Sequence, residues 1–187
     1  MDLVQAMRTV REICVFCGAA AGSFPVYAEA AQALGQAMAE RGLGLVYGAG
    51  NIGLMGVLAD AALASGGEVA GVIPQKLVDR ELAHRGLSEL HVVATMHERK
   101  AKMHELCDAY IALPGGIGTL EEFFEAVTWR QLGYHDKPVA LLNVGGFYDG
   151  IDGFFATMQS DGFLHSDHRD LFFMESDVAR LLDRLGG

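Results

Sequence analysis

Short apolar runs alternate with longer helical patterns along most of the chain, and this alternation restricts the fold more than any other feature. The runs are continuous in apolar character, which is typical of strands that are covered on both faces. They predict strands at residues 12–17, 43–48, 68–74, 109–114 and 137–144. Between and after them we expect helices at residues 25–42, 54–67, 95–107, 119–132, about 147–159 and 176–185. This order predicts an α/β fold, a doubly wound parallel sheet flanked by helices.

The length and composition favour one domain. The chain has 187 residues, 51% of them hydrophobic, and shows no linker or internal repeat, so we expect a single domain over residues 1–187. The segment 75–94 is the least periodic and is interpreted as a lid or a dimer element.

Charge and apolar patterning exclude several classes of partner. The net charge of −10 argues against general binding to nucleic acid or to an anionic membrane. No apolar run approaches the ~20 residues of a membrane span, and the N-terminus does not resemble a secretory signal. With an odd number of cysteines, these features predict a cytoplasmic protein.

Two short patterns resemble metal-ligand spacings. Cys14 and Cys17 form C-x-x-C, but they lie in a predicted strand, where a period of two sends them to opposite faces. We expect buried, reduced thiols there. The H-x-x-H of residues 165–168 lies outside any clear helix. The sequence therefore predicts no metal site.

The first of two glycine-rich turns is GAGNIG, residues 48–53, which matches the dinucleotide fingerprint G-x-G-x-x-G. An NAD site also needs an acidic residue at the tip of the next strand, and that strand ends in GVIPQK. We interpret this turn as a tight strand-to-helix connection, with a ligand on its backbone left open.

The second glycine-rich turn is PGGIGT, residues 114–119, which fits neither the dinucleotide nor the Walker pattern. Its glycines let backbone N–H groups converge at a helix start, and Thr119 adds a hydroxyl, so the turn is a candidate phosphate cradle. Thr119 and Glu122 also fit a T-x-x-E capping box, which would give Glu122 a purely structural role. Both interpretations of Glu122 stay open at this point.

A carboxylate beside a bound phosphate needs a chemical reason. The helix N-terminus is expected to keep Glu122 ionised, and an ionised carboxylate could stabilise positive charge at an anomeric carbon. Cations come from the preceding helix, where Met96 and Lys100 share one stripe with Arg99 beside it. The alternative for Arg99 and Lys100 is a solvated basic patch paired with nearby acids.

Both signatures resemble those of the Lonely Guy family, cytokinin-activating phosphoribohydrolases that are often labelled lysine decarboxylases. PGGIGTLEE is similar to the family motif PGGxGTxxE, and MHERK, residues 96–100, is similar to its second signature. Further similar segments follow in family order over roughly residues 12–165. The resemblance implies a Rossmann-like, dimeric fold.

The resemblance also implies an activity: hydrolysis of the N-glycosidic bond of a nucleoside 5′-monophosphate, with water and without a cofactor. It implies that Arg99 and Glu122 are catalytic and that Glu121 lies close to the ribose. It further implies that the phosphate is held by Gly115, Gly116, Gly118 and Thr119. Lys100 would add positive charge to the site, and Met96 and Trp129 would approach the base.

The chain departs from the family pattern at three positions. Ala19 and Ala20 stand where the family often has two serines, and Ala49 stands where it often has glycine.

Two other functions remain as alternatives. A decarboxylase would need pyridoxal phosphate on a lysine, and none of the four lysines lies in a recognisable cofactor motif. A non-catalytic nucleotide or molybdenum-cofactor carrier would not need both Arg99 and Glu122.

Overall fold

Seven parallel strands form one sheet in the computed structural model, which describes residues 9–80, 82–165 and 170–186. Their order across the sheet is β4-β3-β2-β1-β5-β6-β7. The strands are β1 Glu12–Phe16, β2 Gly44–Tyr47, β3 Val69–Pro74, β4 Glu89–Val93, β5 Ala109–Ala112, β6 Val139–Leu142 and β7 Phe173–Glu175. This is the Rossmann-like doubly wound sheet that the sequence predicted.

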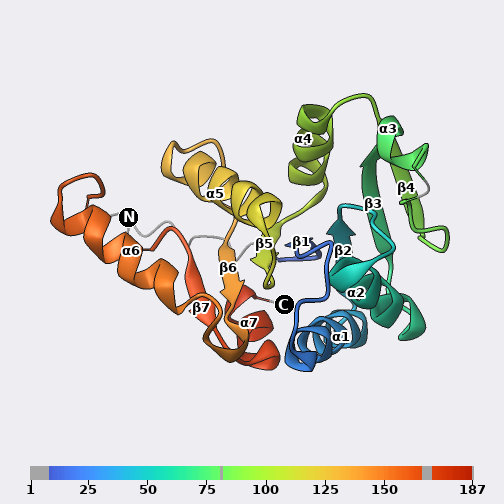
Figure 1. Cartoon of the computed structure of the whole chain (residues 1–187), viewed down its shortest axis with the longest axis horizontal. Coiled ribbons are helices and arrows are strands. Elements are labelled where there is room, and N and C mark those ends of the chain that lie inside the picture. The colour runs from blue at the N-terminus through green and yellow to red at the C-terminus, as the bar shows by residue number, and fades with distance from the viewer. Residues whose placement is uncertain (1–8, 81, 166–169, 187) are drawn as a thin grey trace, which may run out of the picture.

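Helices cover both faces of the sheet (Figure 1). The helices are α1 Pro25–Glu40, α2 Gly53–Ala64, α3 Gln75–Val78, α4 Met96–Leu106, α5 Ile117–Gln131, the short 3-10 helix η1 Val144–Gly146, α6 Asp149–Ser160 and α7 Val178–Leu185. Helices α1, α2 and α7 pack on one face, and α4 and α5 pack on the other. None of the helices in the described ranges is long and apolar enough to cross a membrane.

Most of the expected elements are confirmed, and the shortest ones were missed. Strand β4 and helix α3 occupy part of the segment that was interpreted as a lid or dimer element. Strand β4 lies at the sheet edge, and much of it is exposed, so it lacks the continuous apolar pattern of a central strand. Strand β7 has only three residues and lies at the other edge.

The segment after α3 also touches the first glycine turn. The backbone N–H of Asn51 donates to the carbonyl of Leu82 at 3.2 Å, and that of His84 donates to the carbonyl of Ala49 at 2.9 Å. These two hydrogen bonds fix the turn after β2 against the segment that follows α3.

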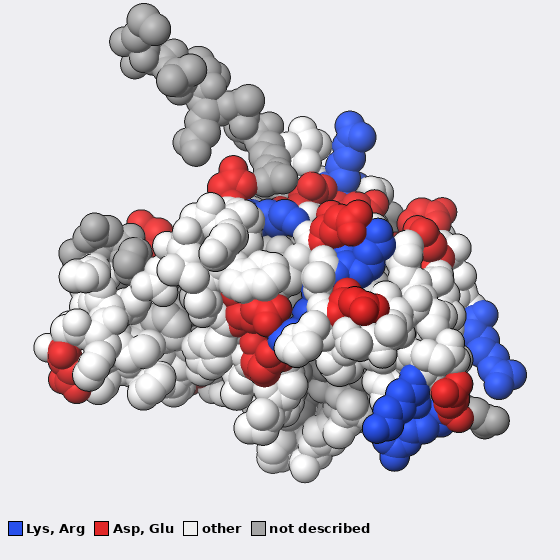
Figure 2. Space-filling view, turned by 90° about the horizontal axis from the view of Figure 1, so that it is seen from above, with Lys and Arg blue, Asp and Glu red and all other residues white. Residues whose placement is uncertain are grey.

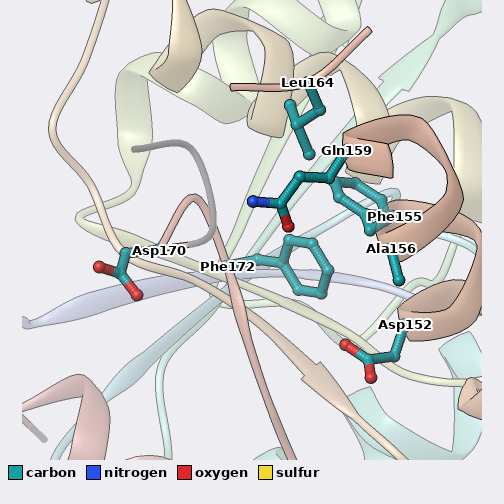
Figure 3. A pocket seen from close by; sticks show the side chains of 7 residues that line it. All are labelled: Asp152, Phe155, Ala156, Gln159, Leu164, Asp170 and Phe172. Atoms are coloured by element: carbon teal, nitrogen blue, oxygen red, sulfur yellow. The ribbon is translucent and has the colours of Figure 1, made fainter. Parts of the chain in front are cut away.

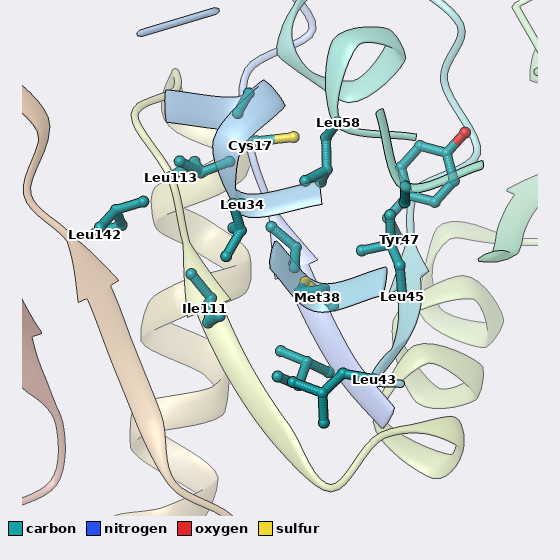
Figure 4. Close-up of a cluster of buried hydrophobic side chains, with 14 of the residues drawn as sticks. Cys17, Leu34, Met38, Leu43, Leu45, Tyr47, Leu58, Ile111, Leu113 and Leu142 are labelled. Carbon is teal, nitrogen blue, oxygen red and sulfur yellow. The ribbon is translucent and has the colours of Figure 1, made fainter. Parts of the chain in front are cut away.

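The hydrophobic core has one layer on each side of the sheet. The layer beneath α1 and α2 contains Leu34, Met38, Leu45, Leu58 and Ile111, all fully buried (Figure 4). Packing of this kind stabilises a domain by roughly 25 cal/mol per Å² of apolar surface removed from water.

The cysteines lie as predicted. Cys17 belongs to the core layer beneath α1 and α2, and Cys14 to the layer beneath α4 and α5. Opposite faces exclude a shared C-x-x-C metal or disulfide site. All three cysteines are buried and unbridged.

The topology creates a crevice between β1 and β5. The chain leaves β1 for β2 on one side, and β5 leads to β6 on the other. The loops that follow β1 and β5 therefore diverge, and such a switch point is where open α/β sheets bind ligands. The loop after β5 is the second glycine turn.

Candidate active site

The second glycine turn exposes its backbone at the start of α5. Helix α5 begins at Ile117, and its N-cap Gly116 offers no side-chain cap. A Cβ atom built on Gly116 or Gly118 would meet no atom within 4 Å, so the backbone of both residues faces open space. At Gly115 a Cβ atom would lie 2.1 Å from Thr119 Oγ1, so only glycine lets the turn pack on Thr119. Uncapped N–H groups at a helix start are suited to an anion.

The T-x-x-E capping box proves wrong. Thr119 is the third residue of α5, not its N-cap, and it is buried. Helix α5 starts two residues before the position that the sequence predicted. Glu122 is therefore free of the structural role that competed with a chemical one.

Arg99 reaches the crevice from α4. Thr95 caps this helix as predicted, because its hydroxyl accepts a hydrogen bond from the N–H of Glu98 at 3.1 Å. The Arg99 guanidinium donates from Nε to the carbonyl of Val72 at 3.1 Å and from Nη2 to that of Gly48 at 3.2 Å. A third nitrogen, Nη1, lies 3.5 Å from Glu122 Oε1. The side chain is thus fixed to the ends of β2 and β3 and aimed at Glu122.

Glu122 and Arg99 form a nearly buried ion pair, with side-chain exposures of 13% and 11%. Burial raises the pKa of Glu122 above its ordinary value, and the Arg99 charge opposes this rise. The helix N-terminus was expected to keep Glu122 ionised, but Glu122 lies in the second turn of α5, where that effect is weak. The neighbouring charge that favours the ionised form is that of Arg99.

Lys100, like Arg99, contacts acidic residues of α5, but it pairs with carboxylates other than that of Glu122. Its Nζ lies 2.5 Å from Glu121 Oε1 and 2.6 Å from Glu125 Oε2. The hypothesis of a solvated basic patch is therefore wrong for both Arg99 and Lys100, since each pairs with an acid on α5.

A pocket of about 270 Å³ lies between these groups. Seven of the predicted site residues line it: Met96, Arg99, Gly116, Gly118, Thr119, Glu121 and Glu122. The pocket wall also includes Cys17, Ala19 and Met55, which were not among the predicted site residues. Ala19 had been noted only as a departure from the family pattern. Position at the end of β1 could have indicated Cys17, and no signal indicated Met55.

Three predicted residues lie outside this pocket. Gly115 lines an adjoining apolar cavity of about 360 Å³, together with Tyr27 and Phe147. Lys100 is outside the pocket and contacts Glu121, which lines it. Trp129 stacks on His104 with ring centroids 4.3 Å apart. The structure thus separates the groups that meet the pocket from those that support it.

A further cavity, of about 330 Å³, lies against α6 (Figure 3). Its lining includes two carboxylates, Asp152 and Asp170, and two aromatic rings, Phe155 and Phe172. Among the described residues, its lining holds these two carboxylates and no lysine or arginine, which does not suit a phosphate.

Metal and nucleic-acid sites find no support in the described part of the chain. No group of three or more potential metal ligands occurs among the described residues. Residues 166–168 of the H-x-x-H pattern lie outside them. On the face in Figure 2, the described lysines and arginines lie mainly beside acidic groups and form no extended basic patch.

The fold and the site define a class of protein: a Rossmann-like α/β protein with an open, uncapped helix N-terminus and a nearly buried Arg–Glu pair beside it. Residues 55–185 match the model of a family described as "Possible lysine decarboxylase". The chain belongs to the Lonely Guy family of cytokinin riboside 5′-monophosphate phosphoribohydrolases.

Three curated relatives show how close this membership is. The chain is 48% identical to LOG of Oryza sativa subsp. japonica over 175 residues, covering 94% of this chain and 72% of that protein. It is 47% identical over 173 residues to the probable enzyme LOGL1 of the same organism, covering 92% and 78%. Identity to Arabidopsis thaliana LOG5 is 45% over 185 residues, covering 99% and 80%.

Solved structures agree on the fold. The molybdenum cofactor binding protein of Rippkaea orientalis superposes with a TM-score of 0.73 at 23% identity, covering 96% of this chain and 97% of that one. The molybdenum cofactor carrier protein of Chlamydomonas reinhardtii gives 0.71 at 21% identity, covering 94% and 96%. At such identities the likeness extends to the fold alone.

Proposed function

We propose that this protein hydrolyses the N-glycosidic bond of adenosine 5′-monophosphate or an N6-modified form of it. The products are the free base and ribose 5-phosphate. One observation carries the proposal: the Arg99–Glu122 pair and the open N-terminus of α5 line the same pocket. Curated relatives at 45–48% identity bear the corresponding name.

The phosphate binds at the start of α5. A Cβ atom on Gly116 or Gly118 would meet nothing within 4 Å, so the helix start is open, and the helix dipole favours an anion there. Thr119 supports the turn from within, because Gly115 packs directly on its hydroxyl. An acidic protein can bind an anionic substrate this way, since main-chain dipoles supply the positive potential.

Hydrolysis then proceeds at the anomeric carbon. As the bond from C1′ to the base nitrogen breaks, its electron pair leaves with the base, which takes up a proton, and a water oxygen forms the new bond to C1′. Positive charge develops on the sugar, and the Glu122 carboxylate stabilises it. The Arg99 charge favours the ionised form of Glu122 against the rise in pKa that burial causes. Glu121, on the pocket wall, accepts hydrogen bonds from the ribose hydroxyls.

The base lies against an apolar part of the pocket. Met55 and Met96 both line the pocket, and flexible thioether side chains adapt to planar or branched groups. Both adenine and a prenylated adenine are candidates on this basis.

We further infer a cytoplasmic, single-domain enzyme that acts as a homodimer without nucleic acid. The buried, unbridged cysteines suit a reducing compartment. Exposed apolar side chains on and near α5, among them Ile117 and Leu132, are candidates for a subunit interface.

The two alternative functions fit the site less well. A decarboxylase would need a lysine to hold pyridoxal phosphate, and none of the residues that line the pocket is lysine. A carrier would have no use for a nearly buried carboxylate beside a bound phosphate. The fold likeness to molybdenum cofactor proteins does not decide this, because it is a likeness of fold.

The test is direct. The pure protein, freed of metal, is incubated with AMP and with isopentenyladenosine monophosphate, and free base and ribose 5-phosphate are followed by chromatography. We expect release from the monophosphates and none from the matching nucleosides. Glu122→Gln should retain the far-UV circular dichroism of the wild type and lose turnover by about 100-fold or more. Intact nucleotide recovered with the wild type would instead favour a carrier, and full turnover by Glu122→Gln would show that the Glu122 charge is not needed for hydrolysis.

A further inference from the structure

Helices α4 and α5 are joined by a second set of charges behind the Arg99–Glu122 pair. Lys100 contacts both Glu121 and Glu125, and only 12% of its side chain is exposed. An ammonium group carries three donors and no acceptor, so it can hold two carboxylates at once. Glu121 lines the pocket, whereas Glu125 does not. Lys100 therefore connects a pocket residue to one outside the pocket.

Glu125 is held in turn by His104. The Nε2 atom of His104 lies 3.4 Å from Glu125 Oε1, the oxygen that Lys100 leaves free. On the other side of the ring, Nδ1 lies 2.6 Å from the hydroxyl of Tyr110. The ring itself stacks on Trp129. The imidazole is thus held at both nitrogens and on one face.

These neighbours also set the protonation of His104. Burial lowers the pKa of His104, and Lys137 and Lys100 act in the same direction, whereas Glu125 opposes them. His135 and Tyr110 face the ring as well. On balance these neighbours favour the neutral imidazole. An ionised carboxylate can only accept, so the ring proton lies on Nε2 toward Glu125, and Nδ1 accepts from the Tyr110 hydroxyl.

We propose that His104 and Glu125 are positioning residues of the reaction: they fix Lys100, and Lys100 fixes the Glu121 carboxylate at the pocket wall beside Glu122. The inference rests on the proposed hydrolysis. Neither His104 nor Glu125 lines the pocket, so both act through Lys100.

The need for such support follows from the exposure of Glu121. Its side chain is 52% exposed, and its ion pair with Lys100 is the described contact that orients it. Without the His104 donor, Glu125 is no longer fixed from that side. The Lys100 side chain, which Glu125 contacts, then regains rotamers that the ordered Glu125 had excluded. Glu121 then meets the ribose in a range of orientations. The phosphate cradle is untouched, because it consists of main-chain groups at the start of α5.

The experiment compares two amides at one position. His104→Asn keeps an acceptor for Tyr110 but cannot reach Glu125, whereas His104→Gln places its amide N–H close to the position of Nε2. Lys102→Gln is the control, because it removes a lysine–glutamate pair on the same helix that lies away from the pocket. For each protein, kcat and KM are measured with the monophosphate that the wild type hydrolyses, and Tm is recorded.

We expect His104→Asn to lower kcat about 10-fold and to leave KM within about twofold, since misplacement of a group at the reacting sugar costs rate and not phosphate binding. His104→Gln should retain kcat within about threefold, and Lys102→Gln should match the wild type. Equal kcat in His104→Asn and the wild type, or equal losses in the two His104 variants, would overturn the positioning role. A wild type that releases no base from any monophosphate overturns the proposed function, and this inference falls with it.

Discussion

The two glycine turns look alike in sequence, but their glycines serve opposite purposes. In the turn after β2, a Cβ atom on Gly48 would lie 1.7 Å from Arg99 Nη2, and one on Gly53 would lie 2.3 Å from the carbonyl of Ala19. In the turn after β5, a Cβ atom on Gly116 or Gly118 would meet no atom within 4 Å. Gly48 and Gly53 make room for other parts of the protein, whereas Gly116 and Gly118 leave the start of α5 open.

This difference reverses the ranking that pattern matching gives. The turn after β2 fits the dinucleotide fingerprint, yet its backbone is occupied by Arg99 and by the segment 82–84. The turn after β5 fits neither standard phosphate pattern, yet it presents an uncapped helix start. Spacing of glycines alone does not say what occupies the space that they leave.

Of the substitutions that test this difference between the two turns, Gly48→Ala is expected to have the largest effect. The new methyl group would displace the Arg99 guanidinium, which leaves Glu122 without its partner. We expect kcat/KM to fall about 100-fold or more, with a loss of about 1–3 kcal/mol in the free energy of unfolding from overpacking. Steady-state kinetics and urea unfolding measure both. Turnover near the wild-type value would show that the position of Arg99 is not critical.

A substitution in the other turn should act on binding instead. In Gly118→Ala the methyl group enters open pocket space, where the phosphate is proposed to lie. We expect KM to rise about 10-fold, while alanine in the first turn of α5 stabilises the free protein by up to about 1 kcal/mol. Kinetics and thermal unfolding of the same sample report the two effects. A lower Tm together with an unchanged KM would contradict the open-space assignment.

The smallest effect is expected one residue after Gly48. Ala49 is fully buried and has a φ of +57°, a backbone conformation that favours glycine. Ala49→Gly relieves that strain but loses a buried methyl group and gains chain entropy when unfolded. We expect the free energy of unfolding to change by less than about 1 kcal/mol in either direction, with unchanged turnover. A larger effect in urea unfolding would give this departure from the family pattern a role of its own.

The central elements were predictable because their physical cause is local. Strands such as β1 and β5 are covered on both faces, so burial leaves a continuous apolar run in the sequence. Strand β4 was missed because it lies at the edge, where exposed positions interrupt that run. The start of α5 was placed two residues late because glycines carry no capping side chain to mark it.

The site was predictable only in part. Arg99 and Glu122 were candidates from their positions in the two motifs, the family resemblance implied their catalytic roles, and the structure places them 3.5 Å apart. What holds Arg99 was not predictable, because its partners are carbonyl groups of Val72 and Gly48, and every residue has a carbonyl. The link from Lys100 to Glu125 and His104 was missed for a related reason: it depends on how two helices face each other.

The attachment of Arg99 to the main chain has a consequence for transplanting this chemistry to another protein. A planar guanidinium spans two carbonyl groups and a carboxylate at once, which a lysine ammonium has no fixed geometry to do. The smallest portable unit is therefore larger than the two sequence signatures. It includes the carboxyl ends of β2 and β3, which give no side chain to the reaction and yet determine where its cation stands.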